Sequence, residues 1–232
     1  MMKNLMTTLA MRYHSTGAAR LLSRFASIAV LAVPAALAQP VQTIPEIKPM
    51  ANEIYRVSHQ DMNWHERGYR IFVAVPERDQ DAQAPVPVLY MLDGNAQFPL
   101  AVNAVAEQWS AQAPSASPKA PLPLIVGLGY PEDKAYPRQR RERDYTYAAP
   151  GDEFAKGGGA ADFYGFLQDA VRPYIKSQYT AASGKQMLAG HSFGGLFTLY
   201  VLLNHRDAFD QYVIGSPSLW WGHGALVTDA NL

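Results

Sequence analysis

The chain has 232 residues, no cysteine, and 20 basic side chains balanced by 20 acidic ones. Because the basic and acidic charges balance, the protein has no net charge that would draw it onto nucleic acid or an anionic membrane. The lack of cysteine excludes disulfides, thiol nucleophiles and thiolate metal sites. Hydrophobic residues make up 48% of the sequence, enough for a sizeable core, and the length suits one domain once a leader is removed.

Residues 1–38 have the pattern of a secretory signal peptide. Three arginines precede an apolar run over residues 25–33, and an Ala-x-Ala cleavage site ends at Ala38. The run is shorter than the ~20 residues that a membrane span needs. We therefore expect export to a bacterial periplasm or beyond and no stable membrane span, with a single membrane anchor as the alternative.

Residues 39–232 are predicted to form one domain in which strands and helices alternate. After an extended lead-in over residues 39–52, the expected strands are 69–76, 88–92, 122–130, the apolar run from Gln186, and 212–214. The expected helices are 100–109, 163–174 with a kink or early end at Pro173, and a run from Leu196 to Leu203. Residues 131–160 are expected to be a loop. This alternation predicts an α/β fold with a mostly parallel twisted sheet and helices on both faces.

The sequence Gly190-His191-Ser192-Phe193-Gly194 is the strongest sign of chemistry in the chain. An apolar strand enters this Gly-x-Ser-x-Gly turn and an apolar helix leaves it, which is the context in which a serine becomes a nucleophile. We expect glycine at 190 and 194 because neighbouring backbones nearly touch there. We also expect Ser192 in a strained conformation with its hydroxyl exposed above the sheet. A glycine-rich turn that happens to hold a serine is the alternative.

A nucleophilic serine also needs hydrogen-bond donors for the oxygen of the carbonyl that it attacks. The backbone N–H of Phe193 is one candidate. The second is expected after the central strand that ends at Leu92, where Gly94 and Asn95 follow Asp93 and glycine lets the backbone come close to a ligand. An Asp-Gly turn with no further role is the alternative.

The general base is the missing part of this prediction. His205 is expected to cap or border the end of the helix after the elbow, and His191 should point away from the serine beside it. His223 comes too early in the fold for the order nucleophile, acid, base. We therefore expect the base and its acid to be absent from the chain as written, and the domain to be incomplete at its C-terminus.

Two further segments are candidates to contact a substrate. A short stretch carries four arginines, of which Arg140, Arg141 and Arg143 could bind an acidic substrate, because guanidinium groups pair with carboxylate or phenolate oxygens. A solvated charged loop is the alternative. Trp220 and its neighbour Trp221 could form an aromatic wall for a planar or sugar-like ligand or belong to a core. No metal site and no cofactor is predicted.

Four motifs occur in order along the chain, and together they resemble the esterase family of α/β-hydrolases that includes esterase D, the antigen 85 mycolyltransferases and the enterobactin esterases. The likeness covers about residues 50–221 and is strongest to the periplasmic trilactone esterases of catecholate siderophores. The motifs are Tyr90-Met91-Leu92-Asp93-Gly94-Asn95, Arg140-Arg141-Glu142-Arg143-Asp144-Tyr145-Thr146, Gly190-His191-Ser192-Phe193-Gly194-Gly195-Leu196 and Ser216-Pro217-Ser218.

The resemblance implies an α/β-hydrolase fold, Ser192 as nucleophile, and Arg140 or Arg143 facing an acidic substrate such as a ferric catecholate. It also implies an oxyanion hole made of the backbone N–H groups named above. The family's histidine, and its acid where one is used, lie past the Ser-Pro-Ser segment. The prediction is an exported serine esterase that hydrolyses carboxylic esters or lactones through a Ser192 acyl-enzyme, without a cofactor. A non-catalytic periplasmic siderophore binder and an acyltransferase using the same serine are the alternatives.

Overall fold

A computed structural model describes residues 41–77, 85–112, 121–179 and 182–228, so the predicted leader lies outside the described residues. The strands are β1 (Tyr55–Trp64), β2 (Arg67–Pro76), β3 (Val88–Leu92), β4 (Leu124–Gly129), β5 (Gln186–His191) and β6 (Gln211–Gly215). The α-helices are α1 (Pro49–Asn52), α2 (Gly94–Ser110), α3 (Arg138–Tyr145), α4 (Ala160–Phe166), α5 (Arg172–Gln178) and α6 (Phe193–Asn204). Short 3₁₀ turns cover Asp152–Phe154, Arg206–Ala208 and Trp221–Gly224, and a π-helical turn covers Leu167–Val171.

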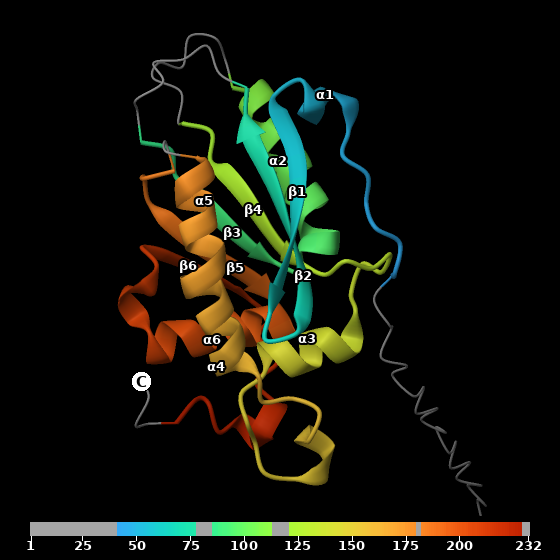
Figure 1. Ribbon diagram of the computed structural model, residues 1–232, viewed down its shortest axis with the longest axis vertical. Helices are drawn as coiled ribbons and strands as arrows, with labels where there is room; N and C mark the ends of the chain where they lie inside the picture. Colours follow the sequence, from blue (N-terminus) through green and yellow to red (C-terminus); the bar gives the residue numbers. More distant parts are fainter. Residues whose placement is uncertain (1–40, 78–84, 113–120, 180–181, 229–232) are drawn as a thin grey trace, which may run out of the picture. The chain divides into compact units, whose positions relative to one another are not determined.

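Within the described residues, six strands form one sheet in the order β1-β2-β4-β3-β5-β6 (Figure 1). Strands β4, β3, β5 and β6 are parallel, β2 is antiparallel to β4, and β1 forms an antiparallel hairpin with β2. The predicted parallel arrangement is confirmed for those four strands, and the hairpin makes the sheet mixed. Because the four parallel strands point the same way, their following loops emerge at one edge of the sheet, called here the carboxyl edge.

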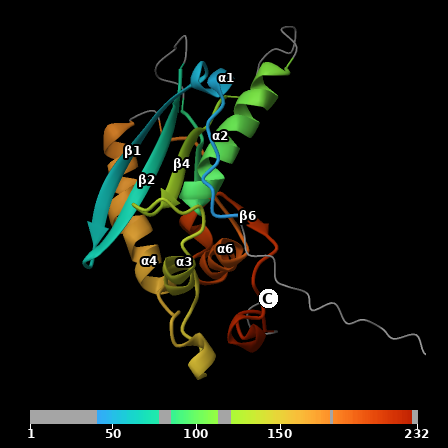
Figure 2. The same cartoon turned by 90° about the vertical axis from the view of Figure 1, so that its right-hand side faces the viewer.

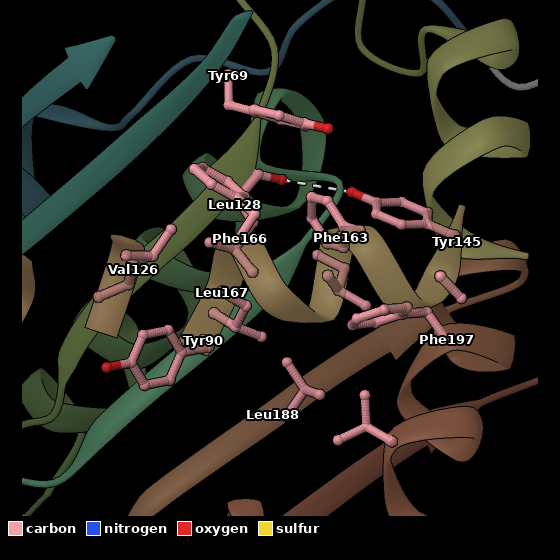
Figure 3. Packing of buried hydrophobic residues seen from close by; sticks show 14 of the residues in the cluster. Tyr69, Tyr90, Val126, Leu128, Tyr145, Phe163, Phe166, Leu167, Leu188 and Phe197 are labelled. Atoms are coloured by element: carbon pink, nitrogen blue, oxygen red, sulfur yellow. Dashed lines mark hydrogen bonds between the residues drawn. The ribbon is translucent and has the colours of Figure 1, made fainter. Parts of the chain in front are cut away.

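Side chains that alternate along the strands build an apolar core on each face of the sheet. On β4, Val126 and Leu128 belong to the larger cluster (Figure 3). Helices α4, α5 and α6 contribute buried side chains to this cluster. Ile125, on the opposite side of the same strand, packs with Phe98 and Val102 of α2. Figure 2 shows α2 and α4 on different sides of the sheet. Helices therefore cover both faces, as predicted.

Strand β1 is a feature that the sequence did not predict. Most of its residues are polar and exposed, because β1 lies at the edge of the sheet and pairs on one side only. The hairpin turn holds His65 and Glu66 at φ 45° and 64°, the left-handed conformations typical of a two-residue turn that matches the twist of paired strands. A polar edge strand lacks the apolar run by which the central strands were predicted.

Two local predictions about helices were wrong, and a third was wrong in part. The segment 131–160 contains α3, so the arginines lie on a helix and not on a loop. Of the kink or early end expected at Pro173, the early end is wrong, because helical backbone continues through this residue into α5. Pro173 lies in the first turn of α5, where its missing N–H costs little, and a π-helical turn interrupts the regular helix just before it. Helix α2 begins at Gly94, six residues earlier than expected, and accommodates Pro99 in its interior.

No helix in the described ranges is both long enough and apolar enough to cross a membrane.

Candidate active site

Ser192 lies in the bend between β5 and α6, at the carboxyl edge of the sheet. Its backbone has φ 59° and ψ −118°, a conformation that is costly for a residue with a side chain. Its N–H donates to Gly215 O at 3.0 Å, and its carbonyl oxygen accepts from the N–H groups of Leu196 at 2.9 Å and Ser218 at 3.2 Å. The predicted strained elbow is confirmed, and hydrogen bonds on both sides of Ser192 hold it in place.

Glycines let the elbow close, although they differ in part from the predicted pair. A Cβ at Gly190 would lie 2.3 Å from Gly194 O, and a Cβ at Gly195 would lie 2.6 Å from Gly215 O. A Cβ at Gly194 would lie 3.2 Å from Leu92 Cβ, which a small shift can relieve. The need for glycine is therefore confirmed at 190 and is weaker at 194. It is strong at 195, where the close approach of two backbones was not expected.

The candidate oxyanion donors begin two helices at this edge. The carbonyl oxygen of Asp93 accepts hydrogen bonds from the third and fourth residues of α2, and neither Asp93 nor Ser192 caps its helix with its side chain. The N–H groups of Gly94 and Asn95 in α2, and of Phe193 in α6, therefore have no acceptor within their own helix. The positive end of each helix favours negative charge at this position.

The side chain of Asn95 cannot contribute to an oxyanion hole. Its Oδ1 accepts from Tyr130 N at 2.8 Å, and its Nδ2 donates to Tyr130 O and Glu132 O, both at 2.9 Å. These bonds hold the loop after β4 against the start of α2. Any contribution of Asn95 to catalysis must come from its backbone, as predicted for this segment.

Arg141 is buried in an ion pair and does not face solvent. Its guanidinium forms a fork with Asp93, with Nε 2.5 Å from Oδ1 and Nη2 3.0 Å from Oδ2, and its side chain is only 8% exposed. Burial raises the pKa of the Asp93 carboxyl above its ordinary range, although the positive charge of Arg141 opposes that rise. The guanidinium also lies 5.7 Å from the ring centroid of Phe193. Arg141 therefore links α3 to both helix starts of the candidate site.

Tyr145 is a second contact between α3 and Asp93, the residue before α2. Its hydroxyl accepts from Asp93 N at 3.1 Å and donates to Leu128 O at 3.5 Å, the bond drawn in Figure 3. The side chain is fully buried, and burial raises the pKa of its phenol well above the usual value. Neutral Tyr145 and charged Arg141 thus bind the backbone and the carboxylate of one residue, Asp93.

Arg140 and Arg143 also have carboxylate partners, but they remain partly exposed. Arg143 forms a fork with Asp144, with distances of 2.6 and 2.7 Å, and Arg140 contacts Glu132. Both arginines border a pocket of about 660 Å³ beside the β1–β2 turn, together with Glu66, Arg67, Gly68, Gln139 and Lys156. Because Arg140 and Arg143 are each paired with a carboxylate, the pocket is less positive than four arginines in one short stretch suggest.

The two tryptophans occupy different environments. Trp221 is 1% exposed; its indole N–H donates to Tyr147 O at 2.9 Å, and the Tyr147 hydroxyl donates to Trp221 O at 2.7 Å. Trp220 is 63% exposed, and its ring centroid lies 5.6 Å from that of Phe193. Trp221 is therefore a core residue, whereas Trp220 presents a free aromatic face beside the elbow.

Among the described residues, no histidine forms a hydrogen bond with the candidate nucleophile. His205 borders the end of α6, as predicted, and stacks on Tyr164 with ring centroids 3.8 Å apart. His223 approaches Glu153 at 3.4 Å, and His191 is exposed at the end of β5. The described histidines are therefore not arranged as a base for Ser192.

The side chain that does contact Ser192 belongs to Ser218, with the two Oγ atoms 3.3 Å apart. The Ser-Pro-Ser segment was noticed in the sequence as a motif, but its contact with the elbow was not predicted. In the part of the chain that the structure describes, no group of three His, Asp or Glu side chains could hold a metal ion.

Comparison with known proteins decides the family. The family described as "Putative esterase" matches residues 63–231. The chain belongs to this family. Ferri-bacillibactin esterase BesA of Bacillus subtilis is 34% identical over 178 residues, 73% of this chain and 59% of its own length. The siderophore triacetylfusarinine C esterase of Aspergillus fumigatus is 36% identical over 169 residues, 70% of this chain and 56% of its own length.

A solved structure of a relative supports the fold. The BES protein from Bacillus cereus superposes with a TM-score of 0.63 at 30% identity, covering 81% of this chain and 69% of its own. Together with the mixed sheet and its helices on both faces, this likeness confirms the α/β-hydrolase fold. The chain spans little more than half the length of the two curated relatives.

Proposed function

We propose that the whole protein is an exported serine esterase that hydrolyses carboxylic esters or lactones through an acyl-enzyme on Ser192. The observation that carries this proposal is the strained backbone of Ser192 between β5 and α6. A strand–elbow–helix of this kind exposes the serine oxygen to a substrate carbonyl, and its geometry is otherwise costly to maintain.

In the proposed reaction, Ser192 Oγ attacks the ester carbonyl and the negative charge develops on the carbonyl oxygen. The backbone N–H of Phe193 and one N–H from Gly94 or Asn95 bind that oxygen. Donors already in position lower the barrier because they need no reorganisation when the charge appears. Asp93, held by Arg141, fixes the backbone from which the second donor comes.

We propose a siderophore ester as the substrate, with a ferric catecholate as the leading candidate. Of the two curated relatives described above, one is named as a siderophore esterase and the other as a ferri-bacillibactin esterase. On this chain, Arg140 and Arg143 at the pocket beside α3 would face the acidic groups, and the exposed ring of Trp220 would stack on a planar catechol.

We propose that none of the described histidines is the general base, because none of them forms a hydrogen bond with Ser192. The acid that orients the base is then not a partner of these histidines either. Residues 1–38 would act as a cleaved signal peptide, with residues 39–232 belonging to the hydrolase domain. Mass spectrometry of the exported protein tests the leader, since the mature chain should then begin at Gln39.

The test of the esterase proposal is hydrolysis by the product of the entire open reading frame. A ferric catecholate trilactone and a p-nitrophenyl ester serve as substrates, and Ser192→Ala is the matched control. We expect hydrolysis by the wild type and a loss of several orders of magnitude in the variant. Equal rates for the two proteins would end the proposal.

A non-catalytic siderophore binder is a second candidate, because no described histidine serves Ser192. It predicts saturable quenching of Trp220 fluorescence by a ferric catecholate without any hydrolysis of the lactone. Quenching should then weaken in Trp220→Phe. An acyltransferase would instead give a product that contains an added alcohol or sugar acceptor.

A further inference from the structure

We propose that Ser218 is a further catalytic residue whose hydroxyl donates a hydrogen bond to Ser192 Oγ while that oxygen attacks the substrate. This inference rests on the proposed role of Ser192 as nucleophile. It starts from the 3.3 Å contact between the two Oγ atoms; Ser218, which makes this contact, is a buried residue that is 7% exposed.

The last residue of β6 and the segment that follows it bind both backbone groups of Ser192. Gly215 O accepts from Ser192 N at 3.0 Å, and Ser218 N donates to Ser192 O at 3.2 Å. Pro217, between them, has a restricted φ. Gly195 gives this segment room, because a Cβ there would lie 3.2 Å from Pro217 Cα. With both backbone groups of Ser192 bonded to this segment, the Ser218 side chain is held beside the nucleophile.

The geometry allows either serine to be the donor, and the reaction selects one of them. Each hydroxyl has one proton and two lone pairs. During attack, the Ser192 proton passes to a general base, an imidazole in the usual mechanism. A lone pair of Ser192 Oγ forms the bond to the carbonyl carbon, and the carbonyl π electrons move to the carbonyl oxygen. Ser192 then has no proton to donate, so Ser218 is the donor and keeps its own proton throughout.

This hydrogen bond should increase the reactivity of the nucleophile. Hydrogen bonds to a group that gains negative charge are stronger than those between neutral groups, so the Ser218 hydroxyl favours the state in which Ser192 loses its proton. The contact also restricts the rotation of the Ser192 side chain. Both effects act on the serine itself and should not depend on which ester is bound.

The test compares the reactivity of Ser192 in three variants of the product of the entire open reading frame. A fluorophosphonate forms a phosphorus–oxygen bond with an attacking serine and releases fluoride, while the serine proton passes to the base. The rate constant is followed by intact-protein mass. Ser218→Ala removes the donor, and Ser218→Thr keeps a hydroxyl. Ser216→Ala removes an exposed hydroxyl two residues away and is the matched control.

We expect Ser218→Ala to react at least about tenfold more slowly, with the loss in ester hydrolysis falling on kcat and not on KM. Ser218→Thr should recover part of the rate, and Ser216→Ala should match the wild type. Wild-type reactivity in Ser218→Ala would overturn the proposal. So would an equal slowing in Ser216→Ala with a parallel drop in Tm, which would indicate a structural role for the segment.

The fluorophosphonate needs no siderophore. Failure to hydrolyse a siderophore lactone would therefore contradict the proposed substrate and leave the comparison of Ser218 variants intact.

Discussion

The guanidinium of Arg141 donates two hydrogen bonds to the carboxylate of Asp93 in the interior of the protein. Asp93 itself has left-handed backbone angles, φ 55° and ψ 44°, directly before the first residue of α2. The ion pair therefore fixes the position where the chain turns from β3 into the candidate oxyanion segment. Its partners are 48 residues apart in the sequence, so it also anchors α3 to the centre of the fold.

Replacement of Arg141 should destabilise the protein strongly. Arg141→Met leaves the buried carboxylate of Asp93 without a partner, which typically costs about 3–5 kcal/mol. The double variant Asp93→Asn with Arg141→Met should lose less than the single one, because no unpaired charge remains. Urea unfolding measures both. Arg140→Ala, at a partly exposed site, is the control and should lose about 1 kcal/mol or less. Similar losses for Arg141→Met and Arg140→Ala would contradict the assigned role of the buried pair.

The glycines of the elbow should respond unequally to alanine. At Gly190 the added Cβ would meet a backbone carbonyl group at 2.3 Å, so Gly190→Ala should cost more than about 3 kcal/mol, beyond ordinary overpacking. At Gly194 the nearest atom is a side-chain carbon at 3.2 Å, and Gly194→Ala should change stability by about 1 kcal/mol or less. Thermal unfolding of the two variants measures this difference. A larger loss of stability in Gly194→Ala than in Gly190→Ala would contradict the geometry assigned to the elbow.

Replacing Trp220 and replacing Trp221 should have different effects on fluorescence and on the free energy of unfolding. Trp221→Phe removes the N–H donor of the partly buried Tyr147 carbonyl and should cost about 1–3 kcal/mol, whereas Trp220→Phe should cost about 0.5 kcal/mol or less. Iodide should quench the emission of Trp220 because its ring is exposed. Loss of quenchable emission in Trp221→Phe, with none lost in Trp220→Phe, would contradict the placement of these rings.

Buried tyrosines should make the fold sensitive to alkali. Burial raises the pKa of Tyr69 to about 12, with Asp144 adding to the rise, and burial raises that of Tyr90 to about 12 against the opposing charge of Arg172. The unfolded chain releases these protons near pH 10, while the native state retains them. Their contribution to stability is therefore complete below pH 10 and declines as the pH rises toward 12, by up to about 1.4 kcal/mol per pH unit for each tyrosine.

The measurement for this prediction combines urea unfolding with absorbance of tyrosinate. Between pH 9 and pH 11 the free energy of unfolding should fall, and part of the tyrosinate signal should appear only when the protein unfolds. A stability that rises over this range would have the wrong sign.

Local patterns in the sequence predicted the elbow and the central strands well. The spacing of Gly190 and Ser192 can be recognised as an elbow from the neighbouring residues alone. Strands such as β3 and β4 are continuous apolar runs because both of their faces are covered. Helix α3 was predicted as a loop because its charged sequence has no apolar stripe. Its buried positions are instead occupied by Arg141, Asp144 and Tyr145.

The contacts that complete the candidate site join distant segments. Ser192 and Ser218 are 26 residues apart, and their meeting depends on β6 pairing with β5, which composition does not encode. Sequence reasoning assigned Arg140, Arg141 and Arg143 one shared role, since nothing in a run of charges distinguishes an arginine that faces a buried carboxylate from one that borders a pocket. Only the degree of burial, which the structure shows, distinguishes Arg141 from Arg140 and Arg143.

Trapping of the acyl-enzyme tests most directly whether Ser192 is the nucleophile. The product of the entire open reading frame is mixed with an activated ester, quenched in acid and digested, and the acylated peptide is identified by mass spectrometry. We expect one acyl group per chain, carried by Ser192 and absent from Ser192→Ala. Ester hydrolysis with the acyl group on another residue, or undiminished in Ser192→Ala, would contradict it.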